Sequence, residues 1–195
     1  MKTLWEGLFK KNPVFVLLLG LVPAVAVTST AHNGWVLGLI TAIVLVLSTM
    51  LNYLLQPLVP QNARIVLRMA ILIVLLVVSY GLLSSWNPQI VAQLGIFLPL
   101  LVVDSLVLQT FDQERSFGAT ALYSLGQGLG FLIALVLIGV IREFLGFGTI
   151  FGAEIVQGSL PPMALASSVP GGLIILGLLL ALVNKFTGQG GELHD

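Results

Sequence analysis

Six apolar stretches restrict what this sequence can fold into; five are about as long as a helix that crosses a bilayer, and the last is short unless it begins near Ala166. The lipid interior offers no water to backbone N–H and C=O groups, so a spanning segment must pair them within a helix or a closed barrel. Runs of about 20 residues have the length of helices rather than strands. We therefore predict membrane-spanning helices at Val14 to Ala31, Val36 to Leu55, Ile65 to Leu83, Ile90 to Phe111, Ala119 to Ile141 and Gly171 to Val183.

The composition agrees with an all-α integral membrane protein. Of 195 residues, 57% are hydrophobic and 8% are charged, whereas soluble domains carry about 25% charged residues. A net charge of zero gives no basis for binding nucleic acid. The chain has no cysteine and two distant histidines, so it supplies no disulfide, thiolate metal ligand or histidine metal site.

We expect a single membrane domain over residues 1–195, with two sets of three spans at 14–83 and 90–183. Residues 1–12 place apolar side chains on one helical face, which indicates either a short helix on the cytoplasmic membrane surface or an extension of the first span. Residues 142–169 are rich in glycine, proline and serine but poor in charge. We therefore expect a long outer loop there, part of which re-enters the membrane.

The positive charges predict the orientation of the chain. With six spans both termini lie on one side, and that side receives seven of the eight Lys and Arg residues, Arg142 being the exception. Because positive residues accumulate in cytoplasmic loops, both termini are predicted to be cytoplasmic. Trp35 and Trp86 then fall at the outer interface, where aromatic residues collect.

A short motif recurs in the first and fourth spans. Residues 19–23 read LGLVP and residues 94–99 read LGIFLP. The copies are three spans apart, so they face opposite ways through the membrane, as in a 3+3 inverted repeat. Glycine and proline in mid-span free backbone groups that are tolerated only inside protein or beside a polar cavity. Either the prolines cause simple kinks, or both spans are broken into half-helices at Gly20, Pro23, Gly95 and Pro99.

Asp104 is the one carboxylate placed well inside an apolar span. An acid at that depth is costly unless water, a partner or an ion relieves it. The functional interpretation is an ion pathway lined by the polar residues that follow the two breaks, namely Thr28, Ser29, Asp104 and Ser105. The alternative is an aspartate that faces a neighbouring protein chain or stays protonated.

Two further patterns have structural interpretations. Gly126 and Gly130 have the spacing that lets two helices approach closely. The adjacent Arg142 and Glu143 form either a local ion pair or a contact with another protein chain.

Taken together, these residues resemble a known family, the membrane subunits of the Rnf and Nqr electron-transport complexes, in particular the E subunit of Rnf and the D subunit of Nqr. The resemblance implies a prokaryotic cytoplasmic (inner) membrane, two half-helix hairpins and an inverted homologous partner similar to the A subunit of Rnf. It also implies an assembly that couples electron transfer to Na⁺ or H⁺ transport, with flavins and iron–sulfur clusters in partner subunits. The similarity rests on Asn12-Pro13, residues 18–23, residues 94–99, Arg142-Glu143, residues 146–151 and residues 170–184.

The sequence departs from this family at two ligand positions. The resemblance implies a [2Fe–2S] cluster inside the membrane, held by cysteines in a Leu-Gly-Leu-Cys-Pro motif and in Thr-Asn-Cys, together with two cysteines of the related membrane chain. Here those positions are Val22 and Ser105. Valine cannot ligate iron, and a serine hydroxyl is a poor substitute for a thiolate. We therefore expect this chain to bind no cofactor.

What remains of the family pattern is a scaffold in which Asp104 stands where the family has an amide. Hard oxygen ligands suit Na⁺ or a proton rather than iron. The resemblance therefore implies a subunit of an ion-translocating oxidoreductase without catalytic residues of its own. The alternatives are an architectural subunit, or a self-contained secondary transporter that uses the same inverted-repeat cavity.

Overall fold

The computed structural model describes residues 12–103, 117–155 and 163–187, which are mainly helical. Short 3₁₀ turns lie at Gln56–Leu58, Gln61–Ala63 and Leu101–Val103, and a two-stranded hairpin joins β1 (Thr149–Ile150) to β2 (Ala153–Glu154). The α-helices are α2 (Leu21–Ala26), α3 (Ala31–Leu55), α4 (Arg64–Trp86), α5 (Pro88–Leu94), α6 (Phe97–Leu100), α8 (Phe117–Phe147), α9 (Ala164–Ser167) and α10 (Val169–Thr187).

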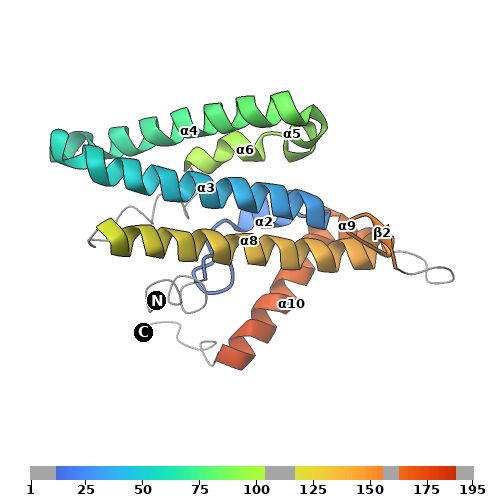
Figure 1. Cartoon of the computed structure of the whole chain (residues 1–195). Coiled ribbons are helices and arrows are strands. Elements are labelled where there is room, and N and C mark those ends of the chain that lie inside the picture. The colour runs from blue at the N-terminus through green and yellow to red at the C-terminus, as the bar shows by residue number, and fades with distance from the viewer. Residues whose placement is uncertain (1–11, 104–116, 156–162, 188–195) are drawn as a thin grey trace.

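Three of these helices, α3, α4 and α8, are long and apolar enough to cross a membrane, and α10 is a shorter apolar helix. In Figure 1, α3 lies between α4 and α8, the broken pair α5 and α6 runs along α4, and α10 leaves the bundle at an angle. The hairpin and α9 gather at one end of α8. The helical membrane architecture predicted from the sequence is thus confirmed in its coarse form.

Helices α3 and α8 pack antiparallel at unusually short range because glycines replace side chains along their contact. A Cβ added to Gly128 would lie 2.8 Å from the Cα of Ala42, and one added to Gly38 would lie 2.8 Å from the Cα of Leu132. Further along, a Cβ on Gly34 would lie 2.7 Å from a backbone oxygen of α8. Small residues at such spacings let helix backbones approach closely in a membrane. We predicted close approach at Gly126 and Gly130; both are buried in α8, and Gly128 between them makes the close contact with Ala42.

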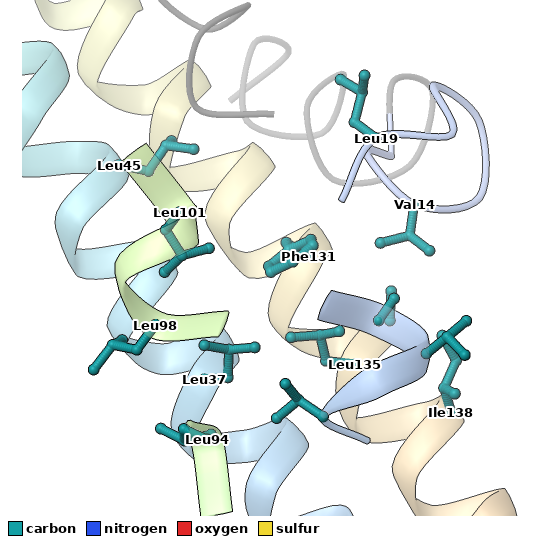
Figure 2. Packing of buried hydrophobic residues seen from close by; sticks show 14 of the residues in the cluster. Val14, Leu19, Leu37, Leu45, Leu94, Leu98, Leu101, Phe131, Leu135 and Ile138 are labelled. Carbon is teal, nitrogen blue, oxygen red and sulfur yellow. The ribbon is translucent and has the colours of Figure 1, made fainter. Parts of the chain in front are cut away.

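The apolar core lies where the broken segments meet this helix pair. Figure 2 shows leucines of α5, α6 and the following turn directed at α3. On the other side, the loop before α2 lies near Phe131 of α8, as the figure also shows. The buried members include Val14, Leu19, Leu37, Leu45, Leu94, Leu98, Leu101, Phe131, Leu135 and Ile138.

The first and fourth predicted spans are interrupted in the described residues. Residues 12–20 form turns, and α2 begins only after Gly20, whose φ is +66°. A Cβ at Gly20 would lie 2.5 Å from the ring of Phe131, so the turn needs glycine for both its conformation and its space. Helix α5 ends at Leu94, Gly95 has a φ of +53°, and α6 begins at Phe97. Pro23 and Pro99 lie inside the short helices α2 and α6 that follow these breaks.

The predicted outer loop at 142–169 is wrong in its first part. Helix α8 continues to Phe147, and the hairpin and α9 follow within the same stretch. The helix continues because residues 142–147 carry no proline and their two charged side chains find buried partners, described below. The predicted interfacial segment 1–12 and the second half of the fourth span, 104–111, lie outside the described residues apart from Asn12.

The close contact at Gly128 yields a stability prediction. In Gly128→Leu, the new side chain meets the backbone of α3, and separating the two helices should cost at least about 1–3 kcal/mol. We expect a lower Tm of the detergent-purified protein and less folded material by size-exclusion chromatography. Gly81→Leu is the control because a Cβ at Gly81 of α4 has no atom within 4 Å. Equal Tm values for the two variants would contradict this account of the α3–α8 contact.

Candidate functional site

Arg142, near the end of α8, is almost completely buried, with 1% of its surface exposed. One side of its guanidinium faces the end of the short helix α9. Nε donates to the carbonyl oxygen of Ala166 at 3.1 Å, and Nη2 donates to those of Ser167 and Ser168, both at 3.0 Å. Three consecutive carbonyls at the carboxyl end of α9 are therefore bound by one side chain.

The other side of the same guanidinium faces the end of α2. Nη1 donates to the hydroxyl oxygen of Thr28 at 3.0 Å and to the carbonyl oxygen of Val25. A guanidinium has five N–H donors, and these bonds use all five. Arg142 therefore joins the carboxyl ends of two short helices that are far apart in the sequence.

The partners of Arg142 explain how a cation is accommodated there. The last carbonyls of a helix have no partner within it and carry partial negative charge. Within residues 12–103, 117–155 and 163–187, no carboxylate accepts a bond from Arg142, so neutral oxygens alone compensate its charge. Burying a charge without such bonds would be far more costly.

Two glycines after α9 make room for this arrangement. A Cβ at Gly172 would lie 2.9 Å from the Cζ of Arg142, and one at Gly171 would lie 1.8 Å from the carbonyl oxygen of Leu165. Any larger residue would push α10 away from α9 and from the guanidinium. The Pro-Gly-Gly sequence at 170–172 thus permits the tight connection that brings the carbonyls of α9 onto Arg142.

Glu143, the next residue, is 3% exposed and binds a different pair of elements. Its Oε2 accepts a hydrogen bond at 2.8 Å from the backbone N–H of Ala31, and Ala31 is the first residue of α3. Its Oε1 accepts from the N–H of Gly152 at 2.7 Å and from the hydroxyl of Thr149 at 3.0 Å. A carboxylate suits the amino end of a helix, where N–H groups are unpaired. Glu143 therefore fixes α3 and the hairpin to α8.

The sequence interpretation of Arg142 and Glu143 as a local ion pair is wrong. Neighbouring residues on a helix point in directions about 100° apart, and the hydrogen bonds of these two go to separate elements. The sequence left open a local ion pair or a contact with another protein chain, whereas the hydrogen bonds described above for both side chains go to other segments of this chain. Two features of the sequence could have indicated the site: an arginine at the end of an apolar stretch, and the later sequence Pro-Gly-Gly at 170–172. Consecutive glycines allow the backbone to approach another group closely.

The structure places the other predicted site residues as follows. Thr28 is fully buried, and its hydroxyl accepts from Arg142 and donates to the carbonyl oxygen of Ala24, so both of its roles are already used. Ser29 is partly exposed beside it. Val22 lies on α2 with 67% of its surface exposed. Asp104 and Ser105 lie outside the described residues.

The chain is similar to known proteins along nearly its whole length. A family model described as "Rnf-Nqr subunit, membrane protein" matches residues 1–180. The E subunit of the Na(+)-translocating ferredoxin:NAD(+) oxidoreductase complex of Acetobacterium woodii is 37% identical over 187 residues, covering 94% of this chain and 95% of that protein. The E subunit of the proton-translocating ferredoxin:NAD(+) oxidoreductase complex of Clostridium ljungdahlii is 34% identical, covering 95% and 91%. The E subunit of the ion-translocating oxidoreductase complex of Pseudoalteromonas atlantica is 36% identical, covering 92% and 84%.

The bonding of Arg142 predicts a large effect of its removal. Arg142→Met leaves the carbonyl ends of α2 and α9 without donors, and Arg142→Lys keeps the charge but replaces the five-donor fork by three donors on one nitrogen. We expect both to lower stability by roughly 3–5 kcal/mol, as when one partner of a buried pair is removed. The measurement is the Tm in detergent, with Lys185→Met, an exposed cation, as control. A wild-type Tm for Arg142→Lys would contradict a role for the fork.

Glu143 gives a separate prediction. In Glu143→Gln, one oxygen becomes an NH₂ group that meets an N–H donor of either Ala31 or Gly152, so one side of the junction opens. Loss of a charge-assisted bond costs about 1.5–3 kcal/mol. Hydrogen exchange should rise at the first turn of α3 or in the hairpin. Glu154→Gln, at an exposed position, serves as control and should leave the exchange unchanged. If exchange in Glu143→Gln is as slow as in this control, the proposed anchoring is ruled out.

Proposed function

Because the chain belongs to the Rnf-Nqr family of membrane subunits, we propose that it acts as the E-type subunit of an ion-translocating oxidoreductase complex. The observation that carries this proposal is the identity of 34–38% to E subunits over more than nine-tenths of the chain. The residues on which the family resemblance rests include the arginine and glutamate of α8 and the glycines at the breaks. The protein supplies a membrane scaffold, and its partners supply the redox chemistry.

The similarity to E subunits does not identify the ion that is transported. One relative at 37% identity is named as Na⁺-translocating and another at 34% as proton-translocating. We therefore propose Na⁺ or H⁺ transport by the assembly, and an experiment has to separate the two ions.

The exposed surface of α2 supports a partner inside the membrane. Helix α2 is held from one side by Arg142, whereas Leu18 and Val22 are 53% and 67% exposed on the interrupted span. An interrupted span leaves backbone groups that need protein or a polar cavity beside them. A homologous membrane chain of inverted orientation, with half-helices of its own, would cover this surface.

The residues of this chain do not fit an intramembrane [2Fe–2S] cluster. The position that the family pattern gives to a cysteine is an exposed valine on α2, and the sequence contains no cysteine elsewhere. In the part of the chain that the structure describes, no three His, Asp or Glu side chains group to hold a metal. We propose that the electron path does not use a cluster bound by this protein, and that flavins and iron–sulfur clusters reside in its partners.

Purification through a tag on this chain tests the assembly. A stable complex with a second Rnf-Nqr-type membrane chain and with flavin- or iron–sulfur-bearing subunits would support the proposal. A homo-oligomer that transports ions alone would overturn it in favour of a secondary transporter.

Asp104 is the proposed ion-handling residue, together with Ser105 and Ser29, while Thr28 contributes through its bond to Arg142. Asp104→Asn keeps the size of the side chain but removes its charge and its hard anionic oxygens. We expect donor-driven Na⁺ or H⁺ uptake into inverted vesicles to be abolished while the complex stays assembled. Asp112→Asn, just beyond the end of the predicted fourth span, is the matched control and should retain uptake. Normal uptake by assembled Asp104→Asn would exclude this role.

A further inference from the structure

Polar side chains gather in one half of the α3–α8 interface. The half between Gly34 and Ala42 is lined mainly by glycine and apolar residues; the hydroxyl of Thr41, buried there, donates to the carbonyl oxygen of Leu37 at 2.8 Å. Beyond Ala42, toward the end of α3, buried polar residues from both helices replace leucine and isoleucine. They include Ser48, Thr49, Asn52, Thr120, Ser124 and Gln127, each no more than 7% exposed. The sequence has no charged residue in α3 or in the first 25 residues of α8.

Three hydroxyl groups in this half, those of Ser48, Thr49 and Ser124, donate their hydrogens to backbone carbonyls. Ser48 and Thr49 both donate to the carbonyl oxygen of Leu45, Ser48 at 3.1 Å, and Ser124 donates to that of Ala121 at 3.0 Å. Such bonds to the preceding turn are usual for serine and threonine in helices. Each hydroxyl oxygen retains lone pairs. The oxygens of Ser48, Thr49 and Ser124 can therefore each accept a further hydrogen bond.

Asn52 adds an acceptor with no donor. Its side chain is 4% exposed, and its Nδ2 donates to Oε1 of Gln56 at 3.3 Å. Its Oδ1 is buried and has no hydrogen-bond partner in the residues described. A buried carbonyl oxygen without a donor is costly, and water is the usual remedy. Asn52 lies on the same helical face as Ser48 and Thr49, since the spacings are four and three residues.

We propose that this half of the α3–α8 interface is a buried hydration site. Water enters near Asn52 and donates hydrogen bonds to the oxygens of Asn52, Thr49, Ser48 and Ser124, and it stops where Gly128 and Ala42 close the helices together. Water fits better than a metal cation because neither helix supplies an anionic ligand in this half. The inference goes beyond the proposed function, since it holds whichever complex contains the chain. In a proton-coupled complex such a site would bring protons part of the way into the membrane.

The absence of cysteine makes a direct test possible, because any introduced thiol is unique in this chain. Ser48→Cys and Ser124→Cys are close in size to the native residues. A thiol reacts with a hydrophilic methanethiosulfonate only as the thiolate, which forms where water reaches it. Leu37→Cys on α3 and Ala134→Cys on α8 are controls, since both native residues are fully buried in the apolar half. The assembled protein is labelled in membranes open on both faces, and the 20.8 kDa chain is then isolated.

We expect Ser48→Cys and Ser124→Cys to react at least about tenfold faster than the two controls, because only the first pair meets water. Equal rates in NaCl and KCl are expected for a water site. Protection by Na⁺ alone would instead identify a cation site and overturn the proposal. Labelling of Ser48→Cys and Ser124→Cys as slow as that of the controls would show a dry interface.

Asn52→Leu provides an independent measurement that does not need a thiol. If Oδ1 is dry and unpaired, replacing it by an apolar group of similar size should raise the Tm. If water is bound there, the substitution removes a satisfied group, and the Tm should stay unchanged or fall. In the Ser48→Cys background it should also slow the labelling. A raised Tm would overturn the proposal.

Discussion

The fold depends on one buried guanidinium. Arg142 uses all five N–H donors on the carboxyl ends of α2 and α9 and on Thr28. Neither short helix is long enough to be stable alone, since helices below about 12 residues are marginal even in favourable sequences. Their free carbonyls would be costly in lipid, and by binding them the arginine connects segments from the two ends of the chain. Glu143 has the complementary role at the amino end of α3.

This junction requires a rigid support, which the α3–α8 pair provides. Glycines at 34, 38 and 128 bring the two backbones into contact, so α8 holds a fixed position relative to α3. Arg142 and Glu143 then project from the end of a helix that cannot shift without breaking that contact. The break at Gly20 is packed against Phe131 of α8, whereas the break at Gly95 is exposed and lines a cavity beside α4.

The sequence predicted the features that depend on local composition. Apolar length predicted the long helices α3, α4 and α8, and the family pattern predicted membership of the Rnf-Nqr family, which the comparisons show. The sequence did not reveal which groups accept hydrogen bonds from Arg142. Most of them are backbone carbonyl oxygens, and every residue has a backbone carbonyl. The sequence indicated a close helix contact around Gly126 and Gly130, but not that Gly128 between them meets Ala42 of α3, because the rotation of α8 decides which residues face that helix. The prediction of a long loop from residue 142 is wrong for a related reason. The charged residues Arg142 and Glu143 suggested the end of a helix, but both are buried and α8 continues to Phe147.

The most direct test of this account is a distance measurement between α2 and α9. Spin labels at Val22→Cys and Leu165→Cys, both at exposed positions, report on the two helices in an otherwise cysteine-free chain. Pulsed electron paramagnetic resonance should give a narrow distance distribution with Arg142 present and a broad one in Arg142→Met. An equally narrow distribution in Arg142→Met would show that the two helices keep their places without the guanidinium, and would contradict the account.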